Sequence, residues 1–259
     1  MSQLFPAFAD EVRNRIEALD RSAASGGLDA AIEILSSSLQ RGGVIHAFGT
    51  GHSEAFAMEI AGRAGGFIPT HQISLRDLVL LGSRELAEMG RPEFERDHTV
   101  ADELFDLYDI RQEDAFIIAS NSGANGSTVG LALRAKAEGL PVIAVTSLEH
   151  SRAVQTKHPS GKRLFEVADV VIDNLAPFGD ATIEVADGLR AGAVSSITAA
   201  YIAQLLTLGT ADRLRLDAEL PPMYISANIP GGDQHNIGLQ ARFGARILPY
   251  AYLDERSTR

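Results

Sequence analysis

Residues 116–128 read Phe-Ile-Ile-Ala-Ser-Asn-Ser-Gly-Ala-Asn-Gly-Ser-Thr, which is a short apolar run followed by small and turn-forming residues. Leu131, Leu133 and Ala135 follow in a stretch with helical character. An apolar strand, a polar turn and a helix in this order are typical of a parallel sheet whose strands are buried between helices. The stretch therefore predicts one strand–turn–helix unit of an α/β fold, with a polar turn at the carboxyl end of its strand.

The same pattern recurs along the chain and defines the sheet. Three further apolar runs precede polar or glycine-rich turns, and a weaker strand is expected near Phe67–Leu75; the three runs are Val44–Phe48, Val142–Val145 and Val170–Ile172. Strands that alternate with helices predict a parallel, doubly wound sheet with right-handed crossovers. We therefore assign the chain to the α/β class.

Other segments are expected to surround this sheet. Apolar residues at helical spacing predict helices within residues 8–40, which gives N-terminal helices over 1–43 and a main domain over 44–259. The charged stretch 76–112 is interpreted as a helical excursion that forms part of a mouth or lid. Residues 184–208 are interpreted as one long helix, either in the core or at a dimer interface. Residues 220–259 are rich in Pro and Gly and end in a strand-like run, Ala245–Tyr252.

Composition excludes several classes of function. The 259 residues carry a net charge of −11, which disfavours nucleic acid and anionic membranes as partners. No apolar run is long enough to span a membrane, and the first residues resemble an amphipathic helix more than a signal peptide. Cysteine is absent, which excludes disulfides and is compatible with the cytoplasmic location that we expect. Any anion site in so acidic a chain must be built locally, from helix N-termini, backbone N–H groups and hydroxyls.

Two turns have the character of such an anion site. The first strand runs into Gly49-Thr50-Gly51-His52-Ser53, where glycines allow close approach and Ser53 adds a hydroxyl. The spacing matches neither a dinucleotide fingerprint nor a P-loop. The second turn is the stretch after Ala119, and ligands bind at the carboxyl ends of neighbouring strands in such sheets. Each turn also has a purely structural interpretation. The candidate phosphate and substrate contacts are Gly51, His52, Ser53, Ser120, Asn121, Ser122, Asn125 and Ser127.

Two residues are candidates for proton transfer. Glu59 stands among apolar neighbours on the helix after the first turn, a setting that suits general acid–base work. The alternative is a solvated residue or an ion pair with Arg63 at i+4. His235 lies in a polar stretch that we interpret as a loop, and a histidine there can move protons near neutral pH. The alternative is a surface histidine. No spacing typical of a metal site or of a serine-hydrolase elbow is found, and no cofactor is expected.

Three stretches together resemble the SIS (sugar isomerase) domain: GTGHS within Val44–Ser53, ASNSG within Phe116–Gly123 and PVIAVTS within Pro141–Ser147. TSLEHS, HPSGKRLFEVADVVIDN, APFGDA and ANIPGGDQHN are similar to stretches of a bacterial group of single-domain SIS proteins related to phosphoheptose isomerase. The resemblance implies a three-layer α-β-α sandwich with a flavodoxin-like parallel sheet, assembled as a homodimer or homotetramer.

The resemblance also implies a ligand and a reaction. Ser120 and Ser122 match the two phosphate serines of the family, Asn125 stands at the third position, and Ser53 matches the serine of the first turn. Glu59 is similar in placement to a catalytic glutamate, and His235 to a late catalytic histidine. A phosphorylated sugar is then the partner and aldose–ketose isomerisation through an enediol the expected reaction. The alternatives are a non-catalytic sugar-phosphate sensor, and a lyase or deaminating isomerase of amino-sugar phosphates.

Overall fold

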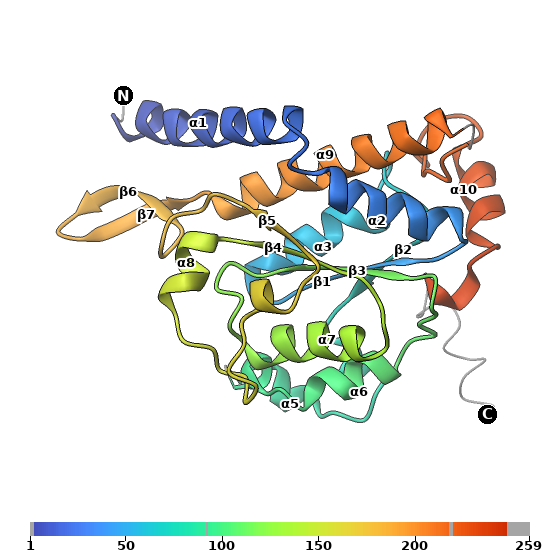
Figure 1. Cartoon of the computed structure of the whole chain (residues 1–259), viewed down its shortest axis with the longest axis horizontal. Helices are drawn as coiled ribbons and strands as arrows, with labels where there is room; N and C mark the ends of the chain where they lie inside the picture. Colours follow the sequence, from blue (N-terminus) through green and yellow to red (C-terminus); the bar gives the residue numbers. More distant parts are fainter. Residues whose placement is uncertain (1–2, 92, 218–219, 248–259) are drawn as a thin grey trace.

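The protein is described by a computed structural model, which places residues 3–91, 93–217 and 220–247. At its centre lies a five-stranded parallel sheet (Figure 1). The order along the sheet is β2-β1-β3-β4-β5, and the strands are β1 Ile45–Gly49, β2 Thr70–Ile73, β3 Ala115–Ala119, β4 Val142–Thr146 and β5 Val170–Asp173. All five predicted strands are confirmed, including the weaker one.

Helices cover both faces of the sheet, which confirms the three-layer sandwich. Alternate strand residues such as Ile45, Ile117 and Ile143 pack in one core cluster. The helices that cover this face include α2 (Asp29–Gln40), α3 (Glu54–Ile60) and α9 (Ser195–Leu216). Strand residues whose side chains point to the other face, such as Phe116 and Ile118, form a second cluster with α6 (Val100–Asp106) and α7 (Gly126–Ala137). Strands buried on both faces favour apolar residues at successive positions, which explains the continuous apolar runs of β3 and β4.

The helices that follow β1 and β3 lie on opposite faces of the sheet. α3 follows β1 and lies on the side of α9, whereas α7 follows β3 and packs with α6 on the other side (Figure 1). The strand order therefore reverses between β1 and β3, which makes their carboxyl ends the switch point where open α/β sheets bind ligands.

The segment between β2 and β3 forms short helices, as expected for residues 76–112. They are α4 (Asp77–Leu80), α5 (Leu86–Met89), the 3₁₀ helix η2 (Phe94–Arg96) and α6. α6 completes the core, while α5 and η2 lie at the carboxyl edge of the sheet.

The prediction of one helix over residues 184–208 is wrong at its N-terminal end. A hairpin of β6 (Ala181–Ala186) and β7 (Leu189–Ala193) precedes α9, and it projects from the body beside α1 (Leu4–Ala24) (Figure 1). The turn between these strands is Asp187-Gly188, with φ of 42° and 79°. Two positive φ angles suit a type I′ turn, for which Asp-Gly is a favoured pair. A helix cannot pass through this turn.

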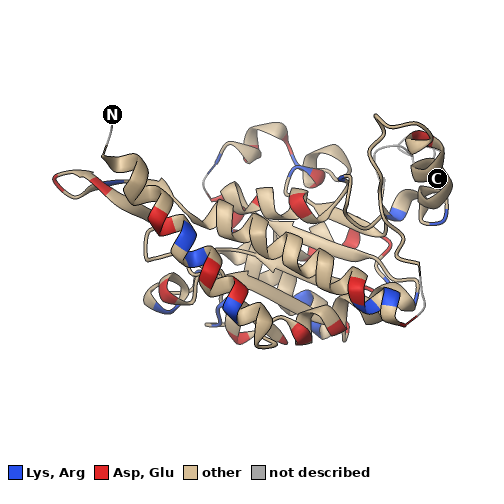
Figure 2. Cartoon of the chain, turned by 90° about the horizontal axis from the view of Figure 1, so that it is seen from above, with Lys and Arg blue, Asp and Glu red and all other residues tan. Residues whose placement is uncertain are grey.

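The helix α1 packs on the hairpin and on α9 and leaves one side in solvent. Phe8 of α1 lies within 2.8 Å of the position that a Cβ on Gly192 would take, so a larger residue there would displace the helix. Its outer side carries charges of both signs along its length (Figure 2). In the described part of the chain, no helix is both long and apolar enough to cross a membrane.

The C-terminal segment folds back against residues 65–68, which lead into β2, and contains a helix that was not predicted. Residues interpreted as a polar loop form α10 (Gly232–Gln240), which includes His235. The start of the expected strand-like run belongs to the 3₁₀ helix η4 (Gly244–Arg246), and residues 248–252 of that run lie outside the described residues. The segment is attached by an isolated bridge between Phe67 and Met223.

The remaining elements connect β4 to the hairpin. They are α8 (Leu148–Ala153), the 3₁₀ helix η3 (Leu164–Glu166) and the loop between them. This loop returns to the turn after β3, because Lys157 N donates to Ala124 O at 2.8 Å and Leu164 N donates to Gly123 O at 2.8 Å.

Candidate functional site

The first turn is a tight bend between β1 and α3. A Cβ on Gly49 would lie 2.3 Å from the main-chain oxygen of Ser53, so only glycine fits at the end of the strand. Gly51 has a φ of 56° and starts the short 3₁₀ helix η1 (Gly51–Ser53). The bend divides the turn between two hollows: Thr50 and Gly51 line a large cavity, whereas His52 and Ser53 line a small recess.

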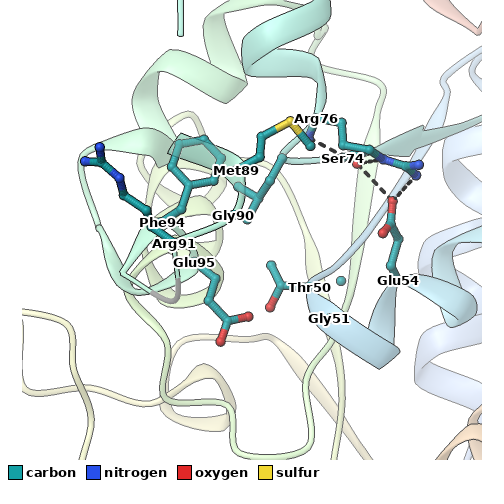
Figure 3. Close-up of a pocket in the computed structure, with 12 residues that line it drawn as sticks. Thr50, Gly51, Glu54, Ser74, Arg76, Met89, Gly90, Arg91, Phe94 and Glu95 are labelled. Carbon is teal, nitrogen blue, oxygen red and sulfur yellow. Dashed lines mark hydrogen bonds and ion pairs between the residues drawn. The ribbon is translucent and has the colours of Figure 1, made fainter. Parts of the chain in front are cut away.

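The large cavity has a volume of about 420 Å³ and opens at the carboxyl ends of β1 and β2 (Figure 3). This volume falls within the range of small-molecule sites. One wall is the first turn, and another is formed by residues of the 76–112 segment, whose role as a mouth or lid stays a prediction. The lining residues are Gly49, Thr50, Gly51, Glu54, Ser74, Leu75, Arg76, Met89, Gly90, Arg91, Phe94 and Glu95.

Glu54 is held on one side of this cavity by three donors. Its Oε1 accepts hydrogen bonds from Ser74 Oγ at 2.9 Å and from Gln72 Nε2 at 3.1 Å, and it pairs with the guanidinium of Arg76 (Figure 3). The carboxylate charge is therefore balanced by Arg76. Sequence reasoning missed Glu54, because a residue at the start of a helix is as often a dipole partner as a ligand contact.

Ser74, which lines the cavity, is hydrogen-bonded to the buried carboxyl group of Asp77. Asp77 Oδ2 accepts the Ser74 backbone N–H at 3.0 Å and the hydroxyl of Tyr108. Burial raises the pKa of Asp77, although the hydrogen bonds from Tyr108 and Ser74 act in the opposite direction. Asp77 therefore fixes Ser74, and through it the side of the cavity that holds Glu54.

The second turn, Ser120–Asn125, connects β3 to α7. Ser120 is 6% exposed and its Oγ accepts the Gly123 backbone N–H at 3.1 Å, so this serine shapes the turn. Ser122 is half-buried and its Oγ lies 3.4 Å from the Ala124 backbone nitrogen. Asn121 Oδ1 accepts from Asn174 Nδ2 at 2.7 Å. The turn thus has one half-buried hydroxyl, Ser122, just ahead of the N-terminus of α7.

A lysine that sequence reasoning did not select lies at this turn. Lys157 Nζ donates to Asn125 Oδ1 at 3.3 Å. Because Lys157 holds the amide oxygen, the NH₂ group of Asn125 is the part left to donate to a ligand. Lys162 is exposed, and Arg163 pairs with Glu166 and the carbonyls at the end of α8. Lys157 differs from these basic neighbours because its loop folds onto the second turn and places its amino group against Asn125. A sequence pattern does not show this contact.

The two turns meet in the recess of about 20 Å³, which has room for little more than a water molecule. Four of the predicted contacts line it together, namely His52, Ser53, Ser120 and Asn121. Gly51 lines the large cavity instead, and Ser122 and Asn125 lie on the turn outside both hollows. Gly51 and His52 are neighbours in the sequence, but Gly51 lines the cavity and His52 lines the recess. The first turn therefore forms the partition between the two hollows.

Ser127, the outlying candidate, has a different environment. It is 0% exposed, and its Oγ donates to the main-chain oxygen of Glu95 at 2.6 Å. Residues 94–98, which we call the strap, cross the N-terminus of α7 at this point. A Cβ on Gly126 would lie 2.1 Å from Arg96 O. Ser127 and Gly126 thus join the second turn to a wall of the cavity.

The two candidates for proton transfer lie apart from both hollows. Glu59 is on α3, where it forms an ion pair with Arg63 and accepts a hydrogen bond from Gln204 Nε2 at 2.9 Å. The ion pair is the alternative that the i+4 spacing predicted. His235 is exposed on α10 and its Nε2 lies 2.9 Å from Met223 O. The structure does not bring either residue to the cavity, and their catalytic roles stay predictions. Among the residues that are placed, no cluster of three or more His, Asp or Glu could hold a metal ion.

A family model supports the assignment that these features suggest. The model of the SIS domain matches residues 7–147, which is more than half of the chain. The chain belongs to the SIS domain family. The match includes both turns and the whole of the strap.

Relatives of this SIS protein cover nearly its full length. A UPF0309 protein of Thermoanaerobacter pseudethanolicus is 32% identical over 93% of this chain and 97% of its own length. A UPF0309 protein of Geobacillus thermodenitrificans is 38% identical over 85% of this chain and 87% of its own. The family likeness therefore extends beyond the matched SIS model into the C-terminal half.

Solved structures show the same fold at low identity. The phosphoheptose isomerase of Francisella tularensis has a TM-score of 0.52 and 16% identity, and covers 82% of this chain and 100% of its own. The phosphoheptose isomerase of Neisseria gonorrhoeae has a TM-score of 0.51 and 17% identity, and covers 83% of this chain and 100% of its own. Both likenesses agree with the flavodoxin-like sheet predicted from the sequence.

Proposed function

We propose that this SIS protein binds a phosphorylated sugar and isomerises it between its aldose and ketose forms through an enediol. The observation that carries the proposal is the placement of the two turns. The polar turn after β3 and the glycine turn after β1 meet at the switch point of the sheet, and a cavity of about 420 Å³ opens on the far side of the glycine turn.

The second turn provides the means to hold a phosphate. Ser122 offers a hydroxyl, Asn125 an amide and Lys157 a positive charge, and all three precede or contact the N-terminus of α7. A helix N-terminus favours an anion, and charge-assisted hydrogen bonds strengthen the contact. In a chain of net charge −11, this local arrangement outweighs the unfavourable overall field.

The cavity provides space for the sugar carbons. Its walls combine hydroxyls, two carboxylates and the guanidinium of Arg76 with the apolar side chains of Leu75, Met89 and Phe94. The polar groups can bind the hydroxyl groups of a sugar, and the apolar ones can pack against its carbon chain. Binding energy from a remote phosphate can be used to position the reacting carbons at such a wall. The fold shared with two phosphoheptose isomerases supports the same class of substrate.

The reaction can be tested by proton NMR in deuterium oxide with a panel of aldose and ketose phosphates. An enediol mechanism replaces the C2 proton by deuterium even where equilibrium hides net conversion. Loss of the C2 signal with one sugar identifies the activity and its substrate. Line broadening without exchange across the panel would leave a phosphosugar-binding protein and refute the isomerase.

A further inference from the structure

Glu95 is a carboxylate that enters the cavity from the strap, opposite the first turn. Its side chain extends from the wall toward Thr50, and its Oε2 lies 3.9 Å from the position that a Cβ on Gly51 would take (Figure 3). It therefore faces the same space as the first turn, although the two are more than 40 residues apart in the sequence.

The backbone of Glu95 is fixed from behind by α7. Ser127 donates to its main-chain oxygen at 2.6 Å, and the missing side chain of Gly126 lets Arg96 and His98 come close to the helix. On the other side Phe94 is 8% exposed and packs in the core. A catalytic group needs a rigid support, and this strap is held by a part-buried hydrogen bond and by the core.

Among the residues that the structure describes, none forms an ion pair with the carboxylate of Glu95. Glu54 is paired with Arg76, and Glu59 with Arg63. For the side chain of Glu95, by contrast, the placed part of the chain supplies neither a hydrogen bond nor an ion pair. An unpaired carboxylate at the wall of a cavity is free to accept a proton from a bound molecule.

We propose that Glu95 is the base of the isomerisation, a step that rests on the function proposed above. Its carboxylate takes the proton from the carbon next to the carbonyl, and the electrons of that C–H bond form the C=C bond of an enediol. Return of the proton to the adjoining carbon regenerates the carboxylate. The hydroxyl proton of one carbon passes to the former carbonyl oxygen of the other, so no oxidant or reductant is consumed.

In this proposal Ser127 is a positioning residue for Glu95. It contacts the strap and does not line the cavity, and its hydroxyl holds the main-chain oxygen of the residue whose carboxylate faces the cavity. Replacing Ser127 by Ala should therefore slow proton removal while the affinity for the sugar phosphate stays near that of the wild type. Ser127→Thr retains the hydroxyl and should restore part of the rate.

The test compares Glu95→Gln with Glu93→Gln in the full-length protein. Glu93 is an exposed carboxylate two residues earlier that does not line the cavity, so it serves as the matched control. Two quantities are measured on each variant: the rate of C2 deuterium exchange, and the affinity for the same sugar phosphate by calorimetry. Glu95→Gln should lower the exchange rate about 100- to 10,000-fold with little change in affinity, and Glu93→Gln should change neither.

The outcomes separate this proposal from the function on which it rests. Exchange at the wild-type rate in Glu95→Gln would overturn the role of Glu95 and leave the isomerase intact. Loss of exchange in Glu59→Gln but not in Glu95→Gln would overturn it as well and assign the base to α3. Wild-type protein that binds the sugar but exchanges no proton would refute the isomerase and the base together.

Discussion

The guanidinium Nη2 of Arg246 lies 2.6 and 2.7 Å from the two carboxylate oxygens of Asp114, 132 residues earlier in the chain. Asp114 is fully buried and also accepts the Val44 backbone N–H at 2.8 Å. Its Oδ2 lies 3.1 Å from Nε2 of the buried His46 on β1. The pair therefore fastens the C-terminal segment to the amino ends of the two central strands.

Asp114→Asn should destabilise the protein by about 3–5 kcal/mol, because it leaves the guanidinium of Arg246 without its buried counter-charge. Urea unfolding at pH 7 measures the difference. Asp109→Asn is a suitable control, since Asp109 is an exposed carboxylate whose nearest oxygen is 3.9 Å from the same guanidinium. Equal losses in the two variants would contradict the importance of burial.

The same pair predicts how stability depends on pH. Burial alone would raise the pKa of Asp114, but the hydrogen bond and charge of His46 and the hydrogen bonds from Arg246 and the Val44 backbone outweigh it and lower the pKa to about 2. A depressed pKa stabilises the fold above the unfolded value of 3.8 and ceases to do so as the pH falls toward 2. The gap between wild type and Asp114→Asn should therefore narrow as the pH falls below about 5. A constant gap down to pH 3 would refute this.

Lys157→Met should weaken sugar-phosphate binding by about 1.5–3 kcal/mol, the usual value of a hydrogen bond to a charged group. The loss should shrink at high salt, because exposed charges are screened. Lys162→Met removes the same charge from the same loop and should have a much smaller effect, because Lys157 Nζ contacts Asn125 whereas no such bond of the Lys162 side chain to the second turn is found among the described residues. Titration calorimetry at low and high salt compares the two. Similar losses in both variants would indicate a general field effect and not a contact.

Substitution of Ser122 in the second turn should change ligand affinity, whereas substitution of Ser127 in α7 should change stability. Ser122→Ala should weaken sugar-phosphate binding by about 1–3 kcal/mol and leave thermal stability nearly unchanged, because its hydroxyl is half-buried. Ser127→Ala leaves Glu95 O without its buried donor and should lower the free energy of unfolding by about 1–3 kcal/mol. Calorimetric binding and thermal unfolding are measured on both. Unchanged affinity in Ser122→Ala would remove that serine from the phosphate site.

Gly126→Ala should displace the strap, since the added Cβ would lie 2.1 Å from Arg96 O and 2.8 Å from His98 N. Overpacking of this kind typically costs about 1–3 kcal/mol. The control is Gly238→Ala on α10, where a Cβ meets nothing within 4 Å and the higher helix propensity of alanine should stabilise slightly. Thermal unfolding gives the sign of each change. A stable Gly126→Ala variant would show that the strap is not held against α7.

Much of the fold could be predicted because its signals are local. Buried parallel strands need an unbroken apolar run and a turn, and both are written in consecutive residues, as at Phe116–Ala119. The hairpin was missed because the small residues of β7 continue without a break into α9. The local signal that could have found it, Asp187-Gly188, lies between Val185 and Leu189. α10 was missed because its composition is polar and rich in glycine.

The candidate site could be predicted only where one segment of chain forms it. The two turns are contiguous motifs and were found. Glu95 was not, because the segment 76–112 contains several glutamates, and which of them lines the cavity depends on how the strap packs on Ser127, Gly126 and the core. Lys157 was missed for the same reason, since the loop that carries it is folded onto the turn by long-range hydrogen bonds. Pairings between distant segments are not encoded in a local pattern.

Phe94 belongs at once to the cavity wall and to the core cluster beneath the sheet. A molecule that fills the cavity therefore touches a side chain of the core, which is assembled only in the folded state. Because such a molecule binds the folded protein and not the unfolded chain, it should raise the melting temperature. At a ligand concentration one hundred times the dissociation constant, the gain is about 2.7 kcal/mol. Melting curves recorded against a collection of sugar phosphates can consequently identify ligands of this protein before any turnover has been detected.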